Sequence, residues 1–171
     1  EHGSLSFETM QVMMQAMNGT DCVPIVRPQW NDPVQIKRVL DIGAYGVLVP
    51  WVNSREDAEN AVGACRYPPQ GIRGYGPRRA ARFDADYFKT AGSEIMVAIQ
   101  VETRQAVENL DEILSVPGIE ACYVGPYDLS CSLGLGVPPK WDNPDYLKVL
   151  DMILAAAAKH RARLSRFFRP L

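Results

Sequence analysis

Short apolar runs alternate with longer amphipathic stretches along most of the chain. Four runs are rich in Val, Ile and Leu and too short for independent helices, so we expect strands buried on both faces of a parallel sheet; they span 22–26, 46–50, 95–101 and 121–125. The periodic stretches around them predict helices at 6–17, 33–42, 54–65, 103–114 and 145–160. This alternation is typical of an α/β fold built from right-handed βαβ units, as an open sheet or a barrel.

Local signals support several of these helix boundaries. Asp32 is placed as an N-cap before Pro33, a residue that favours the first helical position. Ser54 has Asp57 three residues later, which is a second plausible start signal. Gly43 directly follows the helix predicted to end at 42, where glycine commonly stops a helix.

The connection from residue 66 to residue 84 departs from the alternation. It contains three glycines, three prolines and five arginines, and it is too long for an ordinary loop between a helix and a strand. Its glycine-rich part, 71–76, does not match a dinucleotide-binding fingerprint, because it follows no predicted strand and opens no evident helix. We predict a flexible basic loop able to cover a site that holds an anionic substrate; a solvated surface loop is the alternative.

Composition narrows the class of protein. The chain has 171 residues, a length typical of one domain, and a formal net charge of −2. That balance gives no reason to expect nucleic acid or an anionic membrane as a partner, and no apolar run approaches the ~20 residues of a membrane span. The four cysteines form no C-x-x-C pair, and Cys22 and Cys122 fall in predicted strands, where a free thiol behaves as a small hydrophobic group. We therefore expect a reducing, cytoplasmic location.

Polar residues follow three of the predicted strands, at the edge where α/β folds carry their functional groups. Arg27 follows the first strand, Glu102 the third and Asp128 the fourth. Neighbouring parallel strands are ~4.8 Å apart, so the two carboxylates could converge on one hard divalent cation such as Mg²⁺ or Mn²⁺. The alternative is that Glu102 and Asp128 are only N-caps or first-turn acids of the following helices.

Two further titratable residues stand apart from this set. His2 precedes the first predicted helix, and Asp41 lies at the end of the second, where a carboxylate opposes the helix dipole. Either residue could equally be an ordinary surface residue. Spacing alone does not link one to the other.

Five segments occur together and in order: 1–3 (EHG), 26–33 (VRPQWNDP), 66–74 (RYPPQGIRG), 100–103 (QVET) and 125–130 (GPYDLS). In this combination the chain resembles the HpcH/HpaI aldolase/citrate lyase family from residue 1 to about 159. The resemblance implies a (β/α)8 TIM barrel, here truncated at both ends and covering about the end of strand 2 through helix 6. Residues 160–171 would be an atypical basic tail. A partial barrel exposes sheet edges, so we expect the chain to be unstable unless it pairs with another copy.

The resemblance also implies a reaction. Family members are metal-dependent class II aldolases that cleave or form a 4-hydroxy-2-oxo acid from pyruvate and a semialdehyde through a pyruvate enolate. The implied cofactor is Mg²⁺, Mn²⁺ or Co²⁺, and the implied assembly is a homo-oligomer, hexameric in the family. The alternatives are a related C–C lyase acting on oxaloacetate or an acyl-CoA ester, and a catalytically inactive fragment or interaction subunit.

By the same resemblance, Glu102 and Asp128 would be the protein ligands of the metal. Gln100, Asp128 and the backbone at Tyr127 would contact the bound 2-oxo acid. Tyr127 stands where family members usually have a small residue, so we expect a narrower pocket beside Asp128.

Three more roles follow from the resemblance. Arg27 would stabilise the pyruvate enolate by placing a fixed positive charge where negative charge develops. His2 would be the general base that removes the proton of the 4-hydroxyl, since an imidazole titrates near neutral pH. Asp41 would pair with His2, orient its ring and raise its basicity.

Overall fold

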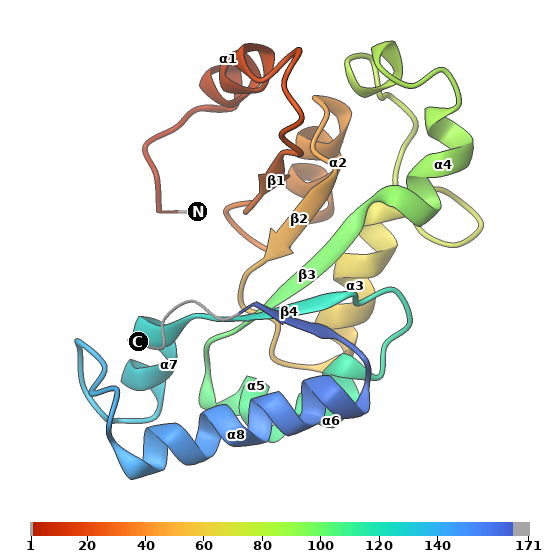
Figure 1. Cartoon of the computed structure of the whole chain (residues 1–171). Coiled ribbons are helices and arrows are strands. Elements are labelled where there is room, and N and C mark those ends of the chain that lie inside the picture. The colour runs from red at the N-terminus through yellow and green to blue at the C-terminus, as the bar shows by residue number, and fades with distance from the viewer. Residues whose placement is uncertain (1, 166–171) are drawn as a thin grey trace.

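Five parallel strands form one sheet in the computed structural model of the chain, which describes residues 2–165 (Figure 1). Their order in the sheet is their order in the sequence: β1 (Ile25–Val26), β2 (Gly46–Val49), β3 (Met96–Val101), β4 (Ala121–Val124) and β5 (Arg163–Ser165). Each neighbouring pair is parallel, so all five carboxyl ends meet at one edge of the sheet.

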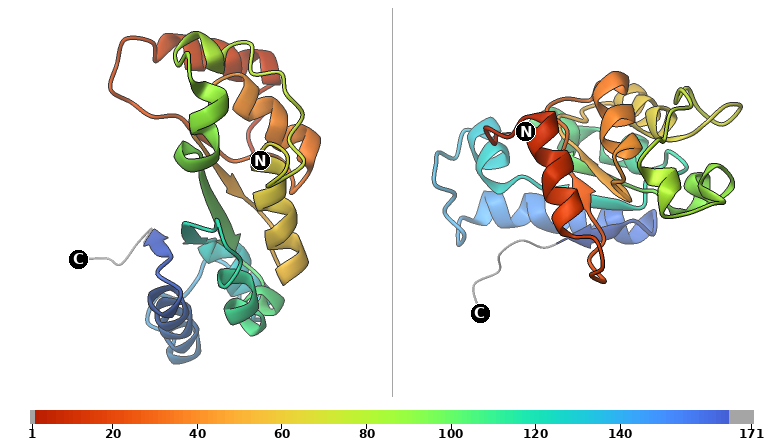
Figure 2. Two further views of the ribbon diagram at one scale, coloured as in Figure 1. Left: turned by 90° about the vertical axis from the view of Figure 1, so that its right-hand side faces the viewer. Right: turned by 90° about the horizontal axis from the view of Figure 1, so that it is seen from above.

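The helices are α1 (Phe7–Ala16), α2 (Pro33–Asp41), α3 (Arg55–Cys65), α4 (Tyr87–Glu94), α5 (Arg104–Glu108), α6 (Leu110–Leu114), α7 (Pro126–Ser132) and α8 (Pro144–Lys159), with a 3₁₀ turn at Ala80–Arg82. Right-handed crossovers between strands in sequential order put the connecting helices on the same face of the sheet. Accordingly α2 packs on α3, α3 on α6 and α6 on α8, in a row that follows the strands (Figures 1 and 2). No helix within residues 2–165 is long and apolar enough to cross a membrane.

The predicted capping signals are confirmed. The Asp32 side chain accepts a hydrogen bond from the Gln35 amide, 2.9 Å away, at the start of α2. Ser54 and Asp57 form a reciprocal capping box at the start of α3. Gly43 adopts a φ of 106° after α2, a conformation that favours glycine. These local interactions set where the two helices begin and where α2 stops.

Strand β3 divides its side chains between two environments. Val97, Ile99 and Val101 are fully buried in the hydrophobic core that the helices cover. Because side chains alternate along a strand, Gln100 shares the opposite face with Ala98, and Glu102 continues that face just beyond the strand. The face turned away from the helices therefore carries the polar residues.

The first strand is shorter than predicted. Only Ile25 and Val26 pair with β2, and Cys22 is exposed, so the prediction that Cys22 behaves as a buried hydrophobic group is wrong. The physical reason is that β1 has a neighbour on one side only in the described sheet, and Pro24 offers no N–H for pairing. Cys122 in β4 is buried, as predicted.

Other elements differ from the sequence prediction. The helix predicted at 103–114 is divided into α5 and α6 at Asn109, whose side-chain amide donates to the Asn53 carbonyl at 2.8 Å. Helices α4 and α7 were not predicted. Within the predicted basic tail, Arg163–Ser165 forms β5 and pairs in parallel with β4, so the sheet extends past residue 160. Residues 166–171 lie outside the described residues.

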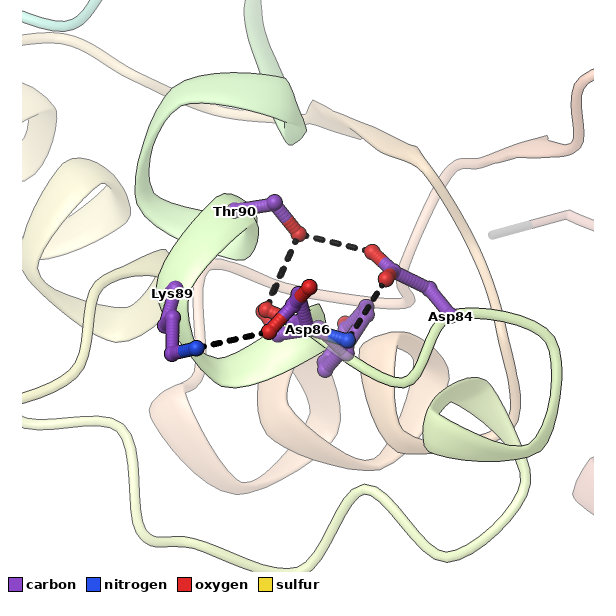
Figure 3. Close-up of polar contacts among 5 residues, drawn as sticks. Asp84, Asp86, Lys89 and Thr90 are labelled. Carbon is purple, nitrogen blue, oxygen red and sulfur yellow. Dashed lines mark hydrogen bonds and ion pairs between the residues drawn. The ribbon is translucent and has the colours of Figure 1, made fainter.

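Short-range polar contacts explain where α4 begins (Figure 3). One Asp84 oxygen accepts the Asp86 amide at 2.8 Å, and the other accepts the Thr90 hydroxyl at 2.7 Å. Lys89 forms an ion pair with Asp86 at 2.7 Å. The Asp84 carboxylate thus links the preceding turn to the first turns of the helix.

The arginine-rich connection 66–84 packs at the amino ends of the strands. Arg66 donates to the carbonyl of Ile95 at 3.1 Å, directly before β3, and Arg79 donates to the carbonyl of Ile42 at 2.6 Å, before β2. Arg66 also pairs with Glu120, the residue before β4. The prediction of a flexible loop over a substrate site is wrong, because these arginines satisfy backbone carbonyls and acids at the opposite edge of the sheet.

Candidate active site

A chain of hydrogen bonds joins the carboxyl ends of β1, β2 and β3. Arg27, which follows β1, donates through Nη1 to Gln100 Oε1 at 3.4 Å. The Gln100 amide donates in turn to Glu102 Oε2. Trp51, two residues after β2, donates its backbone N–H to Glu102 Oε1 at 2.8 Å. Three segments far apart in sequence are therefore linked by one chain of hydrogen bonds that ends on the Glu102 carboxylate.

The central groups of this chain are almost completely buried. Gln100 is 1% exposed and Glu102 is 2% exposed. A buried carboxylate is costly unless it is hydrogen-bonded or paired, and here each oxygen accepts from a different donor. The arrangement holds the carboxylate in one orientation at the carboxyl edge of the sheet.

Strand β4 approaches the same carboxylate through Gly125. A Cβ atom at Gly125 would lie 2.8 Å from Gln100 Nε2, 2.8 Å from Glu102 Cβ and 2.9 Å from Glu102 Oε2. Its φ of −82° suits any residue, so close approach rather than backbone conformation requires glycine here. Gly125 therefore leaves the space in which the Gln100 and Glu102 side chains lie.

We expect Gly125→Ala to displace both side chains. The added methyl group would contact the Cβ of Glu102, which cannot move without its backbone, and overpacking of this kind typically costs about 1–3 kcal/mol. Urea denaturation should show that loss, and Mn²⁺ binding should weaken with it. Gly134→Ala is a poor control because Gly134 has a φ of 78°; Gly63→Ala, in open space on α3, is the matched one. Unchanged Mn²⁺ affinity in Gly125→Ala would contradict the close-packed site.

Tyr127 and Asp128 lie in the first turn of α7 and are both exposed. Val101 of β3 pairs in register with Val124 of β4, so Glu102 and the segment that carries Asp128 leave the sheet at the same edge. Thr103, not Glu102, caps α5, because its hydroxyl accepts the Ala106 amide at 3.0 Å. The N-cap alternative is therefore wrong for Glu102, whereas Asp128 is a first-turn acid.

The amino-terminal segment reaches the surroundings of Arg27. A cavity of about 640 Å³ lies between α1, α2 and β1, and both Gly3 and Arg27 line it. His2 is exposed and directly precedes Gly3. The structure thus brings the segment that carries His2 to the cavity that Arg27 lines.

Asp41 occupies a different place from the other candidates. It ends α2, so it lies where the chain turns into the amino end of β2, whereas Glu102 follows the carboxyl end of β3. Its carboxylate pairs with Arg73 at 2.8 Å. The structure therefore does not bring Asp41 to the Glu102 site of its own chain. The predicted pairing of Asp41 with His2 stays a prediction.

Arg73 is the centre of a buried polar cluster at that amino edge. It is 1% exposed, donates to Asp41 and to the Tyr87 hydroxyl at 3.1 Å, and lies over the ring of Tyr67. Burial by itself would lower the pKa of Arg73, but the hydrogen bond to Asp41 and the contacts with Tyr87 hold that pKa above its ordinary value. Burial raises the pKa of Tyr67 to about 12, against the opposing effect of the Arg73 cation. Arg73 is therefore a permanent internal cation.

Comparison with known proteins decides the family. The model of the HpcH/HpaI aldolase/citrate lyase family matches residues 6–168. The chain belongs to this family. The match extends past residue 160 into the segment predicted to be an atypical tail, in agreement with the pairing of β5.

Curated and solved HpcH/HpaI relatives agree with this assignment. The 4-hydroxy-2-oxo-heptane-1,7-dioate aldolase of Salmonella dublin is 42% identical over 166 residues, which are 95% of this chain and 61% of that protein. The HpcH/HpaI aldolase of Desulfitobacterium hafniense is 30% identical with a TM-score of 0.88, over 96% of this chain and 64% of its own. A family protein of Burkholderia cenocepacia is 29% identical with a TM-score of 0.87, over 96% and 66%. The chain thus spans about three fifths of the length of its curated relatives.

In a member of the HpcH/HpaI family, Glu102 and Asp128 are the two carboxylates to consider as ligands of a divalent cation. Carboxylate oxygens suit Mg²⁺ and Mn²⁺, which commonly take one or two of them and complete their shell with water and substrate oxygens. Glu102 lies fixed beside the space that Gly125 leaves, and Asp128 follows the neighbouring strand. Within residues 2–165, no set of three or more His, Cys, Asp or Glu side chains is arranged to hold a metal. The residues present fit the smaller, two-carboxylate kind of site.

Trp51 and Gly125 are not among the site residues predicted from the sequence. Gly125 ends an apolar strand, and a glycine there is a recognisable sign of close backbone approach. Trp51 offers no such sign, because its φ of 55° is unusual for a bulky side chain and could not be expected from the residue type.

Proposed function

We propose that the chain carries the pyruvate-binding and metal-binding part of a class II aldolase, which cleaves or forms a 4-hydroxy-2-oxo acid. The observation that carries this proposal is the convergence of Arg27, Gln100 and Glu102 on one edge of the sheet. A buried, oriented carboxylate beside a guanidinium combines a cation ligand with a fixed positive charge. Both are needed where an enolate forms from a 2-oxo acid.

In this proposal Glu102 and Asp128 hold Mg²⁺, Mn²⁺ or Co²⁺. When bound, the cation supplies Lewis-acid polarisation of the 2-oxo group. Gln100 keeps Glu102 in place through its amide and keeps Arg27 in place through its carbonyl oxygen. The backbone at Tyr127 contributes contacts to the carboxylate of the 2-oxo acid.

The proposed reaction is a retro-aldol cleavage. The 4-hydroxyl gives its proton to a base, the C3–C4 bond breaks, and its electron pair becomes the enolate of pyruvate as the aldehyde leaves. The enolate then takes a proton at C3. Arg27 stabilises the developing oxyanion, because its charge is present before the bond breaks.

His2 is proposed as the base, since its segment reaches the cavity that Arg27 lines. Asp41 is assigned no step at the Glu102 site of its own chain, because the structure pairs it with Arg73. We further propose a homo-oligomer, because Ile25 of the edge strand β1 and Val23, just before that strand, are exposed.

Pyruvate release from 4-hydroxy-2-oxoheptanedioate tests the function. We expect metal-free protein to be inactive and Mn²⁺ or Mg²⁺ to restore pyruvate formation, followed with lactate dehydrogenase and NADH. Exchange of the pyruvate methyl protons in D₂O, followed by NMR, measures enolate formation without an aldehyde. Absence of metal-dependent exchange and cleavage would overturn the proposal, and pyruvate released only from oxaloacetate would favour the alternative lyase.

A further inference from the structure

Two tryptophan side chains are exposed at the edge that carries the candidate active site. Trp30 is 52% exposed and Trp51 is 41% exposed, and their ring centroids lie 5.8 Å apart with a tilt of 30° between the planes. Large aromatic groups gain free energy when they leave water, so an exposed pair beside a polar site is suited to contact with a ligand.

Each ring is attached to a segment that also supplies a group to the site. Trp51 donates its own backbone N–H to Glu102 Oε1 at 2.8 Å. The same residue therefore carries both the indole ring and the N–H that contacts the carboxylate. Trp30 follows Arg27 by three residues, and Arg27 contacts Gln100. The two paired rings therefore belong to the segments that supply Arg27 and the N–H contact with Glu102.

The backbone of Trp51 is held in an uncommon conformation. Its φ of 55° lies in the left-handed region, which is rare and strained for a bulky residue. Strained residues of this kind occur where the surrounding structure requires them, often at ligand sites. In this conformation Trp51 makes two contacts: its N–H contacts Glu102 and its ring contacts the ring of Trp30.

We propose that Trp30 and Trp51 form the surface that contacts the aldehyde half of the substrate, and that they favour aldehydes with an apolar or aromatic substituent. This rests on the proposed aldolase function. The aldehyde carbon must approach C3 of the enolate, which the proposed function places beside Arg27 and beside the cation site that contains Glu102. The substituent of the aldehyde then extends over the side chains next to these two residues, which are the two indoles.

Trp51→Asn is the informative variant, because asparagine tolerates the left-handed region and keeps the N–H that contacts Glu102. We expect kcat/KM for the addition of pyruvate to benzaldehyde or hexanal to fall about tenfold relative to glycolaldehyde, which corresponds to about 1.4 kcal/mol of lost contact. In Trp30→Ser, which leaves the contact of the Trp51 N–H with Glu102 in place, metal-dependent exchange of the pyruvate methyl protons should stay at the rate of the unmodified protein. Trp141→Phe, on a ring that packs against Tyr146, is the matched control and should leave the aldehyde ratio unchanged.

A binding measurement gives a readout without turnover. The chain has three tryptophans, so in Trp141→Phe the emission comes from Trp30 and Trp51 alone. With Mg²⁺ present and oxalate in place of pyruvate, so that no enolate can form, hexanal should shift that emission and glycolaldehyde should not. If Trp51→Asn does not fold, Trp30→Ser provides the same kinetic test, because the backbone of Trp30 is not in the left-handed region.

The outcomes separate the two proposals. Exchange that persists, together with an aldehyde ratio that neither Trp51→Asn nor Trp30→Ser changes, would overturn the role of the tryptophan pair and leave the aldolase function standing. Loss of exchange in the unmodified protein would overturn the aldolase function itself, and the tryptophan assignment with it.

Discussion

Glu102→Gln should abolish aldol cleavage, lowering kcat/KM on the order of a thousandfold, and should weaken Mn²⁺ binding. The substitution removes a negative charge that is 2% exposed and held by two donors. It also places an amide N–H₂ group against one of those donors. Because Gln100 gives its N–H to Glu102 and its oxygen to Arg27, it cannot turn to meet the new group without losing Arg27.

Calorimetric titration with Mn²⁺ and the pyruvate-release assay measure the two effects separately. Glu108→Gln is the matched control, since Glu108 is an exposed glutamate on α5 and should leave both unchanged. Asp128→Asn should also weaken Mn²⁺ binding, without disturbing the contacts of Gln100. Glu102→Gln with full Mn²⁺ affinity would remove the basis for the metal site.

Asp41→Asn should lower the free energy of unfolding by about 3 kcal/mol, because it leaves the Arg73 cation buried without its carboxylate. Arg73 cannot easily shed its proton, and its side chain is fully covered. Among the described residues, its Nε and Nη1 atoms have no hydrogen-bond partner, so it depends on Nη2 for its contacts with Asp41 and Tyr87. Urea denaturation measures the loss.

Asp86→Asn is the matched control for that experiment. Its ion pair with Lys89 is exposed on both sides, so we expect a loss of less than about 1 kcal/mol (Figure 3). Replacing both Asp41 and Arg73, as Asp41→Asn with Arg73→Met, should recover most of the stability, because no buried charge then remains. Equal losses in Asp41→Asn and Asp86→Asn would show that the buried pair contributes no more than a surface one.

Patterns within short windows predicted most of the elements. Apolar runs located β2, β3 and β4 to within a few residues, and the Asp32 and Ser54 signals located the starts of α2 and α3. Helix α4 was missed because it has only eight residues and includes Thr90, Gly92 and Ser93, which have low helix propensity, while contacts of Asp84 with Asp86 and Thr90 support it. Strand β5 was missed because three residues beside charged neighbours become a strand only by pairing with β4.

The candidate site also has one part that the sequence predicts and another that only the tertiary structure shows. The order of residue types along the chain indicated that Arg27, Glu102 and Asp128 follow strands, and parallel pairing then places them at one edge. The contacts that orient Glu102 join it to Trp51, 51 positions away, and depend on strand register. No local pattern carries that information.

The sequence by itself determined the α/β class and the family, and it supplied the residues that we propose hold a cation and an enolate. Only the tertiary structure decided which of these residues contact one another and which contact other parts of the chain. It placed Asp41 and the arginine-rich connection at the amino edge and brought Trp51 and Gly125 to Glu102. The physical reason is that apolar periodicity and capping act over a few residues. Burial of a charge, in contrast, depends on partners that only strand pairing and helix packing bring together.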